Sequence, residues 1–148
     1  MVDALQALRG VQGTGAVTMV ADIGDLTRFE PPSALMKFWG LVRSEYSSGQ
    51  RRPQGGMTPT GHTHARRVLV EGAWAYRYPA KVSRQLQLRL EHQPKSMQDI
   101  SWKAQVRLCK RYRRLVAKGK HANVVTVAIA RELVGFVWAM AQEVPITL

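Results

Sequence analysis

Apolar residues recur along most of this chain at the three- and four-residue spacing of amphipathic helices. The breaks between these stretches are made by proline and glycine, as at Pro79, Pro94 and Gly119, while Pro31 and Pro32 are suited to the start of a helix. The predicted helices cover residues 2–9, a stretch from the glycines at 13 and 15 to about 23, 31–40, 64–78, 82–92, 99–117 and 122–142. The pattern therefore predicts an all-α protein, with residues 1–148 forming a single helical domain.

The segment from residue 41 to 63 interrupts this pattern. It reads LVRSEYSSGQRRPQGGMTPTGHT and is rich in glycine, serine, threonine and arginine. Structureless loops of more than about 12–15 residues are uncommon inside compact domains and usually serve a function. The long Gly/Arg-rich loop is therefore the first place in which to look for chemistry.

Charge narrows the range of partners. The chain has 22 Lys and Arg against 10 Asp and Glu, a formal net charge of +12, and 18 of the cations lie between residues 41 and 120. A domain this basic usually binds a polyanion, either nucleic acid or an anionic membrane. The most apolar run, residues 122–141, carries Arg131 and Glu132 near its centre, so it is predicted to be a core helix and not a membrane span.

Residues 99–118 concentrate the positive charge on one side of a helix. Five cations recur there at spacings of four, four, three and four, with no neutralising acids evident, and Ala104, Leu108, Tyr112 and Leu115 form the adjoining apolar stripe. A solvated face is the alternative, but five unopposed cations favour contacts with DNA phosphates. These five cations are Lys103, Arg107, Arg111, Arg114 and Lys118.

A glycine turn separates the first two predicted helices. Gly13 and Gly15 flank Thr14, and glycine permits both a positive φ and a close approach of the backbone. Amides at the start of the following helix are suited to a phosphate oxygen, as in a helix–hairpin–helix motif over residues 1–30. A tight turn without a ligand is the competing interpretation, which the local lack of basic residues favours.

The remaining aromatic and sulfur side chains have mainly structural interpretations. Trp39, Trp74 and Trp138 lie on apolar helices and are predicted to be in the core, whereas Trp102 is predicted to be partly exposed. Cys109 is the one cysteine of the chain, falls on an apolar helix face and is predicted to be a core residue. One cysteine allows no internal disulfide, which fits a reducing cytoplasm, and the N-terminus shows no secretory signal.

Three linked strings, taken together, resemble the C-terminal domain of the insertion-sequence "one-ten/one-sixteen" type serine transposases, a family that includes pilin-gene inverting recombinases. The strings are LQALRGVQGTGAVTMVADIGDLTRF, FWGLVRSEYSSGQRRPQGGMTPTGHTHARRVLVEGAWAYR and KGKHANVVTVAIARELVGFVWAM, and they span almost the whole chain. The resemblance implies a DNA-binding protein for transposition by serine-based strand exchange. It also implies a location in the bacterial cytoplasm, in association with the nucleoid.

By this resemblance Ser48 is the nucleophile that attacks a DNA phosphodiester, and Ser47 is the nearest competitor for that role. Cations on and beside the loop would bind the phosphate and stabilise the charge that develops on it. These candidates are Arg51, Arg52, Arg66 and Arg67. Of the last two, one is expected to face the phosphate and the other to face solvent or to pair with Glu71.

The resemblance also sets expectations for partners and cofactors. Related transposases carry an N-terminal nuclease-like domain with acidic metal ligands, which this sequence does not contain, so no metal or other cofactor is expected in this chain and the divalent metal belongs to that domain. The expected partners are DNA, the nuclease-like half or a second copy of the chain, and in some members a guide RNA. No membrane partner is expected. The alternative is a non-catalytic nucleic-acid-binding module in which Ser48 is only a turn residue.

Overall fold

The computed structural model describes residues 2–23, 31–41 and 60–144. All the regular structure in these three ranges is helical, as predicted. The α-helices are α1 (Val2–Leu5), α2 (Gly13–Ile23), α3 (Pro32–Phe38), α4 (Thr60–Trp74), α5 (Arg84–Leu90), α6 (Lys95–Ala117) and α7 (Ala122–Glu143), and a short 3-10 helix, η3 (Ala75–Arg77), continues α4.

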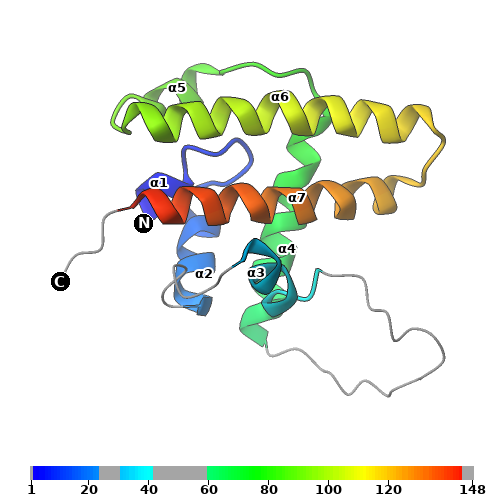
Figure 1. Ribbon diagram of the computed structural model, residues 1–148, viewed down its shortest axis with the longest axis horizontal. Coiled ribbons are helices and arrows are strands. Elements are labelled where there is room, and N and C mark those ends of the chain that lie inside the picture. Colours follow the sequence, from blue (N-terminus) through cyan, green and yellow to red (C-terminus); the bar gives the residue numbers. More distant parts are fainter. Residues whose placement is uncertain (1, 24–30, 42–59, 145–148) are drawn as a thin grey trace.

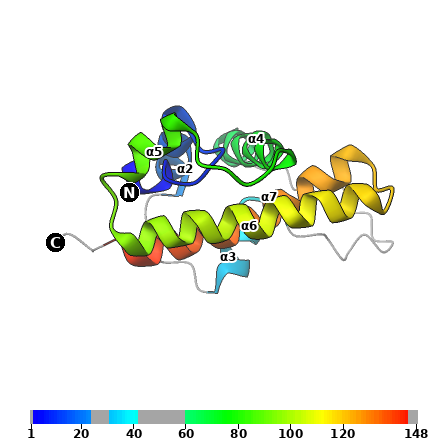
Figure 2. The same cartoon turned by 90° about the horizontal axis from the view of Figure 1, so that it is seen from above.

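The two long helices α6 and α7 run antiparallel and side by side, with α7 across the middle of the molecule and α6 along its upper edge (Figure 1). Seen from above, α2, α4 and α5 lie on one side of this pair and α3 lies on the other (Figure 2). Helix α7 contacts α1, α3, α4 and α6, and its inward positions Ile129, Leu133 and Val137 are completely buried. The core is therefore organised around α7.

Helix α7 is, within the described ranges, the one helix long and apolar enough to cross a membrane by length and composition alone. In this structure its apolar side chains pack against four other helices. Arg131 and Glu132, at its centre, both bond to neighbouring elements. These contacts account for the apolar run as a core helix.

Local sequence signals explain where the helices begin and end. Pro32 occupies the first turn of α3, and the Ser83 hydroxyl accepts a hydrogen bond from the Leu86 amide at the start of α5. Helix α6 ends with Gly119 at φ +81°, where the amide of Lys120 donates to the Leu115 carbonyl and that of Gly119 donates to the Val116 carbonyl. Proline and glycine thus mark these boundaries as the sequence predicts.

Several boundaries differ from the prediction. Helix α1 ends at Leu5 instead of residue 9, because the chain turns towards Gly10, which has a φ of +93°. Helices α4 and α6 each begin four residues early, at Thr60 and Lys95, so the end of the predicted 41–63 loop is helical. Propensity alone does not locate such first turns, because packing against other helices decides whether they form.

The first two helices are held against α4 by two close backbone approaches. A Cβ on Gly10 would lie 2.5 Å from the Gly72 carbonyl oxygen, and one on Gly72 would lie 2.8 Å from the Gly10 carbonyl oxygen. A Cβ on Gly15 would lie 2.7 Å from a methyl group of Val68, also on α4. Glycine is needed at Gly15 for this contact. The positive φ that glycine permits is not adopted at Gly13 or Gly15, since both residues are helical.

The first prediction concerns the Gly10–Gly72 crossing. We expect Gly72→Ala to lower the free energy of unfolding by about 1–3 kcal/mol, because the new methyl group meets backbone that cannot rotate away. Gly135→Ala is the matched control, because Gly135 also lies inside a helix but has nothing within 4 Å of an added Cβ. It should raise stability by roughly 0.5–1 kcal/mol through helix propensity. Chemical denaturation measures both, and equal effects at the two sites would contradict the crossing.

Candidate nucleic-acid interface

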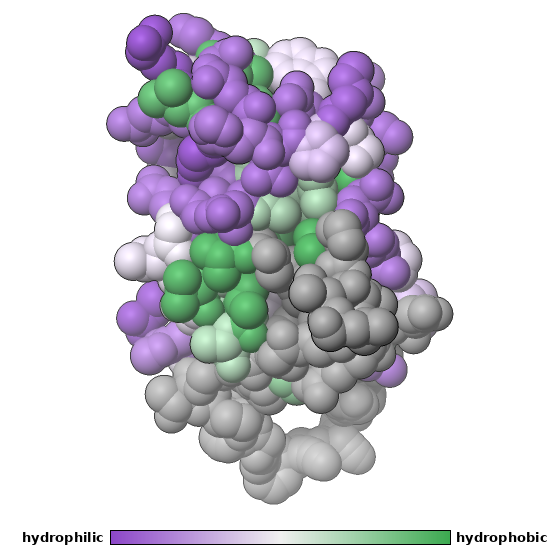
Figure 3. All heavy atoms as spheres, turned by 90° about the vertical axis from the view of Figure 1, so that its left-hand side faces the viewer, coloured by the Kyte–Doolittle hydropathy of each residue, from purple (hydrophilic) through white to green (hydrophobic). Residues whose placement is uncertain are grey.

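The α6 cations lie on the side of the helix away from the core. Lys103, Arg114 and Lys118 are exposed, whereas the predicted apolar residues Ala104, Leu108 and Tyr112 are buried. A shallow groove of about 790 Å³ is lined by four of the five predicted cations, Lys103, Arg107, Arg111 and Arg114. Trp102 also lines it and is 47% exposed, as the sequence predicts. Seen from the left-hand side of Figure 1, hydrophilic residues cover the upper region over α5 and α6, and apolar residues gather below it (Figure 3).

An acid on the neighbouring helix partly neutralises this face, contrary to the prediction. The Glu132 carboxylate of α7 pairs with Arg107 through one oxygen and with Arg111 through the other, each at 2.5 Å. Sequence periodicity within α6 could not reveal this acid, because it comes from another helix. Two cations sharing one carboxylate still leave an excess of positive charge, and Lys103, Arg114 and Lys118 add to it.

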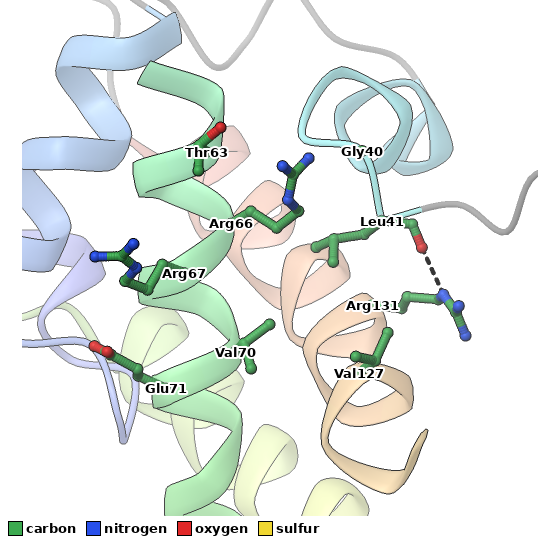
Figure 4. Close-up of a pocket in the computed structure, with 9 residues that line it drawn as sticks. All are labelled: Gly40, Leu41, Thr63, Arg66, Arg67, Val70, Glu71, Val127 and Arg131. Carbon is green, nitrogen blue, oxygen red and sulfur yellow. Dashed lines mark hydrogen bonds between the residues drawn. The ribbon is translucent and has the colours of Figure 1, made fainter. Parts of the chain in front are cut away.

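The root of the 41–63 loop is a second candidate region. The last described residues before the gap, Gly40 and Leu41, border a cavity of about 480 Å³ between the end of α3, α4 and α7 (Figure 4). Gly40 has a φ of +73°, and a Cβ there would lie 2.4 Å from Nη1 of Arg66. Glycine at this position therefore allows the arginine to reach the backbone.

Two arginines hold the backbone at this root. Arg66 donates from Nη1 to the Trp39 carbonyl at 3.3 Å, and Arg131 donates from Nε to the Leu41 carbonyl at 2.5 Å. Figure 4 shows Arg66 directed towards Gly40 and Arg131 joined to Leu41 by its hydrogen bond. Arg131 was not among the predicted site residues. The one sequence feature that pointed to a role for it is that it carries a charge inside an otherwise apolar helix.

Arg66 and Arg67 lie on different sides of α4, as the sequence suggests for adjacent helical residues. Arg67 is exposed and also lines the cavity, but its side chain points away from Arg66, to the same side of α4 as Glu71 (Figure 4). The two side chains do not come within the 4.0 Å of an ion pair. The structure thus brings Arg66 to the loop root and leaves Arg67 at the surface.

Other predicted site residues have separate outcomes. Ser47, Ser48, Arg51 and Arg52 lie outside the described residues. Gly13 and Gly15 begin α2 and are distant in the fold from the loop root, across α4 (Figure 1). The described residues gather no three His, Cys, Asp or Glu side chains that could hold a metal ion.

Cys109 and the tryptophans divide into buried and exposed groups. Cys109 is 2% exposed, and burial raises the pKa of its thiol although nearby Arg9 and Arg113 act in the opposite direction. This confirms the predicted core position and argues against a nucleophilic thiolate. Trp39 is buried and Trp138 packs against the core, but the prediction for Trp74 is wrong, since it is 45% exposed at the end of α4.

Comparison with known proteins identifies the class of this helical, cation-rich domain. Residues 2–87 match the family described as Transposase IS116/IS110/IS902, and the chain belongs to that family. The match covers α1 to the middle of α5 and includes the glycine crossing and the loop root.

Individual relatives extend this similarity through α6 and α7. The chain is 48% identical to the protein y4qE of Sinorhizobium fredii, which is named as a transposase, over 97% of the chain and 37% of that protein. It is 26% identical to the transposase for insertion sequence element IS1533 of Leptospira borgpetersenii, over 80% of the chain and 35% of that protein. The chain thus spans little more than a third of these relatives. No solved structure matches it significantly.

The second prediction concerns the Glu132 ion pairs. We expect Glu132→Gln to lower the free energy of unfolding by about 1 kcal/mol at low salt, because Arg107 and Arg111 would lose their shared counter-charge. The loss should shrink in 1 M NaCl, where screening acts within ~3 Å. Glu143→Gln makes the same charge change at an exposed position of α7 and should have little effect. Thermal denaturation at two salt concentrations measures this, and identical results for the two variants would contradict it.

Proposed function

We propose that this chain is the DNA-binding, serine-bearing part of a transposase that performs strand exchange. The observation that carries the proposal is the exposed cationic face of α6. Of the two acids at this face, Glu132 pairs with only two of the five cations and Asp99 pairs with Lys95. Membership in a transposase family makes DNA the polyanion that this face would bind. Each cation placed near a phosphate would release a counterion and so strengthen binding at low salt.

The proposed chemistry is a transesterification by Ser48. The serine oxygen would form a bond to a backbone phosphorus while one phosphorus–sugar oxygen bond breaks, and the hydroxyl proton would pass through solvent to the released sugar oxygen. Attack by a sugar hydroxyl of another strand would then reverse these bonds and restore the serine. One phosphodiester is exchanged for another, so no high-energy cofactor is consumed.

Support for this assignment comes from the resemblance around Ser48 and from how the described residues hold the segment next to it. Arg66 and Arg131 fix the carbonyls of Trp39 and Leu41, immediately before the loop. A nucleophile needs a defined starting geometry, and these two hydrogen bonds fix the backbone of the residues that lead to it. We assign to Arg51, Arg52 and Arg67 the role of phosphate contacts, and to the amides of Gly13–Gly15 a contact with the DNA backbone.

The third prediction tests DNA binding by α6. The combined change of Lys103, Arg114 and Lys118 to Gln should flatten the slope of log K against log salt by up to about 2.7, since each lost phosphate contact contributes about 0.9. A triple Gln variant at Lys37, Lys81 and Arg84, which are exposed on α3, a loop and α5, removes the same charge elsewhere. Fluorescence anisotropy with a duplex measures both. An equal change in the two triples would show that only net charge matters.

The fourth prediction tests the nucleophile. We expect Ser48→Ala to abolish any covalent protein–DNA adduct while leaving salt-dependent binding within about twofold, because the hydroxyl adds no charge. Ser47→Ala is the matched control and should retain the adduct. Denaturing gel electrophoresis after incubation with labelled DNA detects the product. If Ser48→Ala still formed the adduct, the assignment to Ser48 would be wrong; if only Ser47→Ala lost it, Ser47 would be the nucleophile.

A further inference from the structure

The junction between α4 and η3 carries a stacked group of side chains that the proposed function does not use. The Arg77 guanidinium lies 4.4 Å from the ring centre of Trp74 and 4.3 Å from that of Tyr78. Its two terminal nitrogens are also fixed, since Nη1 donates to the Trp74 carbonyl at 2.8 Å and Nη2 donates to the Tyr78 hydroxyl at 2.9 Å. The three side chains, called here the aromatic platform, therefore form one ordered unit.

Both rings of the platform are accessible to solvent. Trp74 is 45% exposed and Tyr78 is 54% exposed, whereas Tyr76, which lies between them in sequence, is fully buried. Single exposed apolar residues are ordinary at protein surfaces. Two large rings joined through one cation make a broader surface, and this surface is both aromatic and positively charged.

The platform rests on a rigid base. The Tyr76 hydroxyl donates to the Arg9 carbonyl, and the Arg9 guanidinium donates to the carbonyls of Ala75 and Pro79, each at 2.8 Å. Ala75 and Tyr76, which lie between Trp74 and Arg77 in sequence, and Pro79, which follows Tyr78, are thus held by Arg9. Side chains that are already ordered lose little entropy on binding, which favours recognition of a ligand by a preformed surface.

We propose that the aromatic platform stacks an unpaired base of single-stranded nucleic acid. Aromatic rings and arginine planes are the groups on which unpaired bases stack, and the cation also attracts the neighbouring phosphate. Bases inside a duplex already stack on one another and do not offer a face. The inference rests on the proposed function because it takes nucleic acid as the ligand. It adds single strands as a second kind of ligand and places their binding at the platform instead of on α6.

Trp102 provides a matched comparison within the same chain. It is 47% exposed, close to the value for Trp74, and it lies among the cations of α6. Trp74 and Tyr78 each stack on an arginine, and no such stack is recorded for Trp102 among the described residues. A ring that is merely exposed beside cations can therefore be compared with a ring built into the platform.

The experiment uses the 148-residue chain and a ten-nucleotide strand with 2-aminopurine at its centre, whose fluorescence falls when the base stacks. DNA and RNA versions are titrated separately, together with a DNA duplex of the same sequence. We expect quenching by the unaltered chain, and a roughly five- to hundredfold weaker single-strand affinity in Trp74→Ala. Duplex affinity should change less than twofold. Arg77→Lys, which keeps the charge but loses the plane, should also reduce quenching, whereas Trp102→Ala should not.

The outcomes separate this proposal from the proposed function. Unchanged quenching in Trp74→Ala, an equal loss by Trp102→Ala, or a parallel loss of duplex affinity would overturn the platform. Salt-dependent duplex binding without any 2-aminopurine quenching would overturn the platform alone. A third outcome is quenching that depends on Trp74 while duplex binding is unaffected by the triple change on α6. It would support base stacking on the platform and refute DNA binding by α6. The strand that is bound more tightly identifies its ligand as DNA or RNA, and far-UV circular dichroism checks that each variant is folded.

Discussion

The crossing of residues 9 and 10 over the end of α4 sets the positions of the other elements. Gly10 and Gly72 meet backbone to backbone, and this contact leaves no space for a side chain on either residue. Beside it, Arg9 donates to the carbonyls of Ala75 and Pro79 and to the Gln105 side chain of α6 at 2.7 Å. Residues 9 and 10 thus connect the N-terminal turn to α4, to the loop after it and to α6. A displacement of these two residues would change the contacts of all of these elements.

The adjacent residues Arg131 and Glu132 connect the two candidate regions of the surface. Arg131 bonds to the Leu41 carbonyl at the loop root, and Glu132 pairs with Arg107 and Arg111 on the basic face of α6. Both lie at the centre of the core helix, where a charge is tolerated only with a partner. The middle of α7 therefore fixes the loop root relative to the cationic face.

Sequence reasoning predicted the helical class and the position of nearly every helix because the signals involved are local. Pro32, Gly119 and the apolar spacing of α6 each act within one turn or one helix. It failed where the deciding partner is distant in sequence. Glu132, for example, is 25 residues from Arg107. The apolar residues around Trp74 favour a core position for it, but Trp74 is exposed because α4 ends at this residue. Periodicity identified the cations of α6 as part of the candidate site. It could not identify Arg131, whose partner Leu41 is 90 residues away in sequence.

The same balance of charge links stability to the proposed ligand. Like charges along α6 repel one another, and Glu132 relieves this repulsion for only two of the five cations on the predicted face. A phosphate backbone lying along the helix would supply the missing counter-charge, and a ligand that binds only the folded chain stabilises it. The short N-terminal helices, by contrast, are held by close packing that no ligand replaces. The fold therefore combines a part fixed by steric fit with a part whose stability would respond to DNA.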